Sequence, residues 1–261
     1  MSGARAEGTA GREGRAGRGG AVTTFRRGPT AFSGVFPLVR WRRRRPFRPF
    51  PILAVLLFAF APSAVAREIR GAPAGDFDGY ILALSWSPTW CALEGRSGAA
   101  QCDPAADTGF IVHGLWPQKG DDWPAWCRTA RRDPTRRESA AMAGLMGSAG
   151  LAWYQWKKHG RCTGLDPADY FALLRKAAAA IRRPAILRRL RRPVDLAPRV
   201  IEEAFLAANP RLSPDMVTVT CEKGYIDEVR ICLDRGLRPA ICPEAARRDC
   251  ALPRARLLPV R

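Results

Sequence analysis

Eight cysteines, all placed after residue 90, constrain the fold of this 261-residue chain more than any other feature. An even number of cysteines behind an export signal indicates disulfides, and eight allow four of them. Zinc is the weaker alternative, because no two cysteines have the gap of two to four residues typical of zinc sites and both histidines stand apart from such pairs. We therefore expect a domain held by four disulfides, with no metal site.

The predicted export signal occupies the first 66 residues. Residues 40–48 are strongly basic, residues 51–61 are apolar, and Ala64, Val65 and Ala66 form a small-residue cleavage site. The apolar run is too short to span a membrane, which takes about 20 residues. We predict a leader at 1–66 that is cleaved after Ala66, and a mature domain at 67–261 that is secreted or periplasmic and has no membrane anchor.

The predicted mature domain is basic. Its 195 residues contain 31 Lys and Arg against 22 Asp and Glu, a net charge of +9. Positive potential of this kind steers an anionic polymer such as a nucleic acid. Six of the arginines lie at 182–192, and this run is either a solvated face or an RNA-contacting patch.

Apolar runs and their breakers indicate an α+β fold. Strands are predicted at 80–86, 110–113, 216–221 and 225–233, with a tight hairpin at 222–224. Helices are predicted at 138–146, 151–159, 167–181 and 200–208, and residues 91–107 are predicted to be a loop. Strands on both sides of a central block of helices favour α+β over alternating βαβ units.

The chain has only two histidines, and each lies in a dense motif. His113 follows the apolar run at 110–112 and precedes Gly114, which relieves crowding where that strand is expected to end. His159 closes the predicted helix at 151–159, beside Lys158 and before Gly160. A single histidine in a sequence is more often structural than catalytic. A lysine beside an imidazole, however, is unfavourable in a core and well suited to a phosphate.

The residue types predict acid–base chemistry at phosphorus. Imidazole can both take and give a proton near neutral pH, so two of them can serve as the base and the acid of one reaction. A neighbouring cation can hold the phosphate oxygens. His113, His159 and Lys158 are therefore the candidate catalytic residues.

Four segments of the chain resemble the ribonuclease T2 family. Three carry the likeness: residues 82–88 ahead of Cys91, residues 110–117 around His113, and residues 158–162 around His159. Residues 228–232 are a weaker match, and the likeness covers most of 76–250. It implies a central antiparallel sheet with flanking helices. It also implies an endoribonuclease that cuts single-stranded RNA through a 2′,3′-cyclic phosphate without a metal or other cofactor, and we expect a monomer.

The same likeness implies a role for each site residue. His159 would take the proton from the ribose 2′-hydroxyl, and His113 would protonate the departing 5′-oxygen. Lys158 would hold the phosphate. Trp116 resembles an aromatic residue that stacks on a base, since every base offers a π-face. A core tryptophan is the alternative for Trp116.

The chain departs from the family at two neighbouring positions. Family members commonly have His-Glu where this chain has Tyr154 and Gln155. Both side chains can hydrogen-bond a phosphate, but neither carries the lost charge. Because both histidines and Lys158 remain, we interpret the change as a variant active site. The competing hypothesis is a secreted protein on the same scaffold that binds RNA or another polyanion without cutting it.

The resemblance also implies a disulfide pairing, which spacing alone leaves open. The link at Cys127 would join the loop after the His113 segment to the end of the His159 helix, and so fix the two histidines relative to one another. The four implied pairs are Cys91 with Cys102, Cys127 with Cys162, Cys221 with Cys250, and Cys232 with Cys242.

Overall fold

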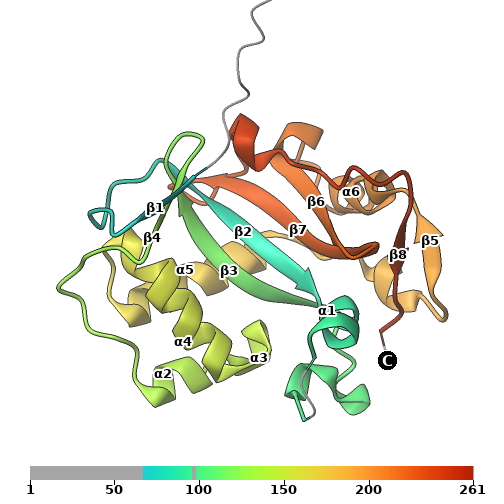
Figure 1. Ribbon diagram of the computed structural model, residues 1–261, viewed down its shortest axis with the longest axis horizontal. Coiled ribbons are helices and arrows are strands. Elements are labelled where there is room, and N and C mark those ends of the chain that lie inside the picture. Colours follow the sequence, from blue (N-terminus) through green and yellow to red (C-terminus); the bar gives the residue numbers. More distant parts are fainter. Residues whose placement is uncertain (1–66, 96–97, 261) are drawn as a thin grey trace, which may run out of the picture. The chain divides into compact units, whose positions relative to one another are not determined.

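The predicted leader, residues 1–66, lies outside the part of the chain that the computed structural model describes, which is residues 67–95 and 98–260. These residues form an α+β domain (Figure 1). In chain order its strands and helices, including the short 3₁₀ helices η1 to η6, are β1 Glu68–Arg70, β2 Gly79–Trp86, α1 Ser87–Leu93, η1 Ala100–Cys102, η2 Pro104–Ala106, β3 Phe110–Gln118, β4 Trp123–Ala125, α2 Arg136–Ala140, α3 Ala143–Met146, α4 Ala149–Lys158, η3 Gly160–Thr163, α5 Pro167–Ala180, η4 Ala185–Arg189, β5 Val194–Leu196, α6 Pro198–Ala208, η5 Pro214–Met216, β6 Val217–Glu222, β7 Tyr225–Asp234, η6 Glu244–Ala246 and β8 Ala255–Leu257.

The main sheet is built around β2. This strand pairs antiparallel with β3 on one side and with β7 on the other, and β7 forms a hairpin with β6. β8 and β5 extend the sheet beyond β7, and β1 and β4 form a separate parallel pair. Helices α2 to α5 lie on the β3 side of the sheet and α6 lies by β6 (Figure 1). The expected antiparallel sheet with flanking helices is confirmed, apart from the short parallel contact between β7 and β8.

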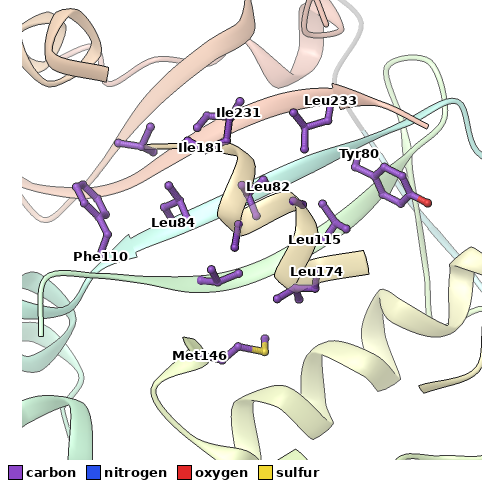
Figure 2. Close-up of a cluster of buried hydrophobic side chains, with 14 of the residues drawn as sticks. Tyr80, Leu82, Leu84, Phe110, Leu115, Met146, Leu174, Ile181, Ile231 and Leu233 are labelled. Atoms are coloured by element: carbon purple, nitrogen blue, oxygen red, sulfur yellow. The ribbon is translucent and has the colours of Figure 1, made fainter. Parts of the chain in front are cut away.

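The apolar core lies on one face of this sheet. Alternate residues of β2 (Tyr80, Leu82, Leu84 and Trp86) are buried there. Figure 2 shows α5 crossing this face, and Leu174 of this helix belongs to the same buried cluster as these β2 residues. The opposite face of β2, β3 and β7 carries a smaller apolar cluster of Ile81, Cys232 and Cys242 as well as polar side chains.

β3 contains a bulge at His113. In the register with β2, Ala83 pairs with Gly114 and Leu84 pairs with Val112, so His113 is one extra residue on β3. Bulges of this kind redirect a side chain and are common next to active sites. The sequence predicts that the strand ends at His113. This is wrong, because the bulge lets the strand continue to Gln118.

The bulge also decides which side of β3 faces the core. Phe110 and Val112 belong to the main core cluster before the bulge, and Leu115 belongs to it afterwards. Trp116 therefore points to the other face, where it is only half-buried. Strict alternation from Val112 would place Trp116 in the main core. It instead lies against the smaller apolar cluster of Ile81, Cys232 and Cys242 on the opposite face, with part of its surface in the cavity.

Most other predicted elements are confirmed within two residues, notably α4, α5, α6 and the hairpin. The hairpin turn has Lys223 and Gly224 at φ 48° and 88°, as a two-residue turn between twisted strands requires. The predicted helix at 138–146 is divided into α2 and α3, and α2 begins at a capping box of Thr135 and Glu138.

The segment at 91–107 was wrongly predicted to be a loop. It contains the end of α1 and two short 3₁₀ helices. Pro88 lies in the first turn of α1. Proline is well tolerated there, because a helix does not use the first N–H groups. No helix among the described residues is long and apolar enough to cross a membrane.

All four disulfides that the resemblance implied are present. Cys127–Cys162 joins the segment after β4 to the turn after α4. The backbone N–H of Trp126 also donates to the carbonyl of Lys158 at 2.7 Å, one residue before His159. The loop after β3 is thus tied to the end of α4 by a covalent bond and a hydrogen bond.

We predict that stability losses follow the length of the loop that each disulfide closes. Cys127–Cys162 spans 35 residues and Cys232–Cys242 spans 10. Replacing both cysteines of a pair by serine should lower the free energy of unfolding by about 4 kcal/mol for the first pair and about 3 kcal/mol for the second, because the longer loop loses more chain entropy on closure. Urea unfolding of the two variants measures this, and a larger loss for the short loop would contradict it.

Candidate active site

A cavity of about 550 Å³ lies between β3, β7 and the C-terminal half of α4. It brings together all six residues that the sequence analysis selected. They are joined by residues from β4 and from the segment after β7. The lining is Ile81, His113, Trp116, Gln118, Asp121, Trp123, Tyr154, Gln155, Lys158, His159, Arg230, Ala245, Ala246 and Arg248.

Helix α4 presents its site residues in two neighbouring rows. The helix starts at Ser148, whose side chain accepts a hydrogen bond from the N–H of Leu151 at 3.0 Å. Residues four apart lie on one side of a helix. Gln155 and the C-cap residue His159 therefore form a buried row, whereas Tyr154 and Lys158 form a more exposed row that also lines the cavity.

His159 is an uncharged, buried imidazole. His159 is 4% exposed, and its Nδ1 has no hydrogen-bond partner among the described residues. Burial, followed by the positive charges of Lys158 and His113, lowers the pKa of His159 well below 6.5. The ring is therefore neutral near neutral pH and able to accept a proton.

His113 has the opposite environment. Its Nδ1 is hydrogen-bonded to Oε1 of Glu228 on β7. Arg230 binds the other carboxylate oxygen of Glu228 through Nε at 2.9 Å and through its terminal nitrogen at 2.8 Å. Burial tends to raise the pKa of Glu228, but the hydrogen bond and charge of His113 and the charge of Arg230 outweigh it and lower the pKa to about 2. A full negative charge thus lies against the His113 ring.

Trp116 connects the two histidines. Its ring stacks on that of His159 with centroids 5.3 Å apart, and it meets His113 edge-on at 5.2 Å. Arg230 lies 5.3 Å from the ring centroid, and the indole N–H donates to Oε1 of Gln155 at 2.8 Å. Trp116 therefore forms part of the cavity wall and sets the spacing of β3 and α4.

Two glycines in the motifs are needed because of close packing. A Cβ at Gly114 would collide with Nε1 of Trp116 and Oε1 of Gln155. A Cβ at Gly160 would lie 2.8 Å from the rings of Trp156 and Tyr170. We expected the strand to end at Gly114. The strand continues, and Gly114 instead makes room for the hydrogen bond between Trp116 and Gln155.

The cavity is strongly cationic. Lys158, Arg230 and Arg248 line it, against one acidic residue, Asp121. Lys158 lies 3.7 Å from a carboxylate oxygen of Glu68 on β1, whereas the neighbouring Lys157 is paired with Asp133 outside the cavity. Phosphate oxygens are the natural ligands of such a lining. No group of three or more His, Cys, Asp or Glu in the described part of the chain could hold a metal ion.

A second cavity, of about 780 Å³, shares His113 with the first. Its charged lining is acidic, namely Glu94, Asp227 and Glu228. Burial and then the charge of Glu228 raise the pKa of Asp227 to about 6. His113 thus separates a cationic cavity from an acidic one. The six arginines at 182–192 line neither of them.

Sequence reasoning missed Glu228, Arg230 and Arg248 as site residues. Glu228 and Arg230 had a detectable signal, because two charged residues spaced by two in an apolar strand share one face. Arg248 lies after η6 in irregular structure, where no periodic pattern could have selected it.

Comparison with known proteins settles the family. Residues 77–242 match the ribonuclease T2 family, a span that contains the bulge and both histidines. The chain belongs to the ribonuclease T2 family. The resemblance that the sequence motifs suggested is confirmed.

Two bacterial relatives illustrate the similarity. A ribonuclease of Aeromonas hydrophila is 40% identical over 122 residues, which are 47% of this chain and 53% of that protein. Ribonuclease I of Escherichia coli (strain K12) is 30% identical over 168 residues, which are 49% of this chain and 62% of that protein. The chain therefore spans about half to three fifths of the length of these relatives.

Solved plant structures share the fold. An RNase-related protein from Calystegia sepium has a TM-score of 0.57 at 23% identity, over 70% of this chain and 98% of that chain. Ribonuclease MC1 from bitter gourd seeds has a TM-score of 0.54 at 18% identity, over 70% of this chain and 100% of that chain.

We predict that the His159 ring titrates with a midpoint below 6.5. Burial and the nearby positive charges oppose its protonation. Because the chain has only two histidines, an NMR titration gives two sets of ring signals, and a His113→Asn variant assigns them. A midpoint for His159 at or above 6.5 would show that the ring is solvated or paired with an anion.

Proposed function

We propose that this protein is a secreted or periplasmic endoribonuclease that acts on single-stranded RNA. The ribose 2′-oxygen attacks the adjacent phosphorus, the bond from phosphorus to the 5′-oxygen breaks, and the products are a 2′,3′-cyclic phosphate and a free 5′-hydroxyl. One observation carries the proposal. Two histidines with opposite electrostatic environments line the same cationic cavity.

His159 is suited to be the general base. It must be neutral to accept the 2′-hydroxyl proton, and burial beside Lys158 keeps it so. With Nδ1 buried, Nε2 is the nitrogen left for the cavity. The proton that it takes is returned to solvent when the cycle closes.

His113 is suited to be the general acid. An imidazole that carries a proton on Nε2 can transfer it to the leaving 5′-oxygen, and the Glu228 carboxylate lies against Nδ1, the other ring nitrogen. The opposed environments of the two rings are the arrangement by which one active site provides both an acid and a base.

Positive charge and hydrogen-bond donors stabilise the transition state at phosphorus. Lys158 faces the cavity and can neutralise the charge that develops on the phosphate oxygens. The Oε1 atom of Gln155 is occupied by Trp116, so its amide N–H groups are the ones free to donate to a phosphate oxygen. This donation needs no charge, which explains how a neutral side chain can serve at this position.

The two cavities suggest how the RNA chain crosses the site. The phosphate and the upstream nucleoside would occupy the cationic cavity, where Trp116 and Tyr154 provide aromatic surface; Tyr154 is the more open ring, at 43% exposed. The nucleoside beyond the leaving oxygen would then enter the acidic cavity on the other side of His113. Hydrogen bonds from base amino groups to Asp227 or Glu94 would suit that cavity.

The relatives support this proposal at the level of activity and ligand. The bacterial relatives are ribonucleases. Structures with the same fold have nucleotides bound, namely an RNase MC1 variant with 5′-UMP and RNase NT with 5′-AMP. Export is supported by the leader predicted at 1–66 and by eight cysteines that are all in disulfides.

We predict that the purified protein cleaves single-stranded RNA in the presence of EDTA. His113→Ala and His159→Ala should each lower turnover about a hundred- to ten-thousand-fold, because the chain has no third histidine to replace them. A fluorogenic RNA substrate measures this. Binding of RNA without cleavage by the unmodified protein would favour the competing hypothesis of a non-catalytic polyanion-binding protein.

We predict that Gln155→Glu moves the pH–rate profile to higher pH. A carboxylate near the two imidazoles favours their charged forms and so raises the pKa of each. Gln155→Ala, the matched neutral control, should lose rate with little movement of the profile, because it removes hydrogen bonds but no charge. Turnover against pH on one dinucleotide substrate compares the three proteins, and identical profiles would place residue 155 away from the reacting phosphate.

A further inference from the structure

Glu228 is a buried carboxylate that touches the imidazole of His113 and does not itself line the cationic cavity. Its side chain is 5% exposed, and both of its oxygens are engaged, one by Nδ1 of His113 and the other by two nitrogens of Arg230. A buried ionised carboxylate is costly unless it is paired and hydrogen-bonded. The network of His113, Glu228 and Arg230 gives both carboxylate oxygens of Glu228 a hydrogen-bond partner.

The strand register holds this network in place. On β7, Glu228 pairs with Ser85 of β2 and Arg230 pairs with Ala83 of β2. Ala83 lies next to the bulge that directs His113 toward the same face. β7 has its own irregularity here, because its register with β6 shifts between Val219 and Cys221. His113 and Glu228 thus come from opposite sides of β2 and meet over it.

The contact defines the chemistry of the His113 ring. An ionised Glu228 can only accept a hydrogen bond, so Nδ1 must carry a proton. Among the described residues nothing engages Nε2, which is the nitrogen left to give up and regain a proton. A carboxylate that binds the far nitrogen of a catalytic imidazole fixes its tautomer and orientation and stabilises the protonated ring.

We propose that Glu228, held by Arg230, is the positioning residue of the general acid, fixing the Nδ1–H tautomer of His113 and supporting the ring while it carries the proton for the leaving 5′-oxygen. This inference rests on the proposed function. Arg230 has two roles in it, since the same guanidinium also packs on Trp116 and lines the cationic cavity. Glu228 itself does not line the cationic cavity that we propose for the phosphate.

A comparison of leaving groups tests the proposal. One substrate is a dinucleoside monophosphate, whose 5′-oxygen needs a proton to depart. The other is a nucleoside 3′-(4-nitrophenyl phosphate), whose phenolate departs without one. Glu228→Gln should lower kcat about tenfold or more on the first substrate, with KM little changed, and less than about threefold on the second. Glu228→Asp should recover part of the loss.

His113→Ala on the same two substrates provides the reference. It should show the same selective loss, only larger. If His113→Ala lowers both rates equally, the acid role of His113 fails, and the proposed function with it. If His113→Ala is selective but Glu228→Gln lowers both rates equally, Glu228 is only structural and the present inference is overturned.

Two further measurements keep the test valid. Glu222→Gln removes a carboxylate from β6, where Glu222 is half-exposed and lines neither cavity, and should leave both rates unchanged. If Glu228→Gln does not fold, Glu228→Asp replaces it, because this variant keeps the charge but shortens the side chain that reaches Nδ1 of His113. It should show a smaller but still selective loss of kcat, and equal losses on both substrates would overturn the proposal.

Discussion

The pairing of β2 with β3 on one side and with β7 on the other is the constraint on which the site depends. β2 is apolar and buried, so its register with both neighbours is fixed by the core on its inner face. That register sets His113 opposite Glu228. The covalent and hydrogen-bonded ties at Cys127 and Trp126 then bring the end of α4 against the same face. The register of the sheet and these two ties together position the residues of the site.

Charge is distributed over this frame with a clear division. On one side of His113 the charged residues are Lys158, two arginines and Asp121, and on the other they are all carboxylates. The field at an imidazole on such a boundary points from the cationic cavity toward Glu228, which lies at Nδ1. Trp116 is the apolar spacer that keeps the two histidines apart while holding both in place.

Much of the site could be predicted from the sequence, because its residues lie in two short motifs whose chemistry is local. His113 lies in one motif. Gln155, Lys158 and His159 lie in the other, where the helix periodicity brings their side chains to neighbouring positions. The partners from β7 could not be found in this way, because the contact between Glu228 and His113 spans 115 residues and depends on strand order. The strands β1, β4, β5 and β8 were missed because three residues are too few to show alternation.

The bulge at His113 makes the number of residues in β3 as important as their identity. Because the side-chain period of a strand is two, each residue added or removed exchanges its two faces. His113 is the exception, because it is the extra residue of the bulge. Deleting it would leave a regular strand in which Val112 and Leu115 still face the core and Trp116 still faces the cavity. A gap at position 113 in an aligned sequence would therefore mark a protein that has lost the imidazole and the bulge but kept the cavity wall.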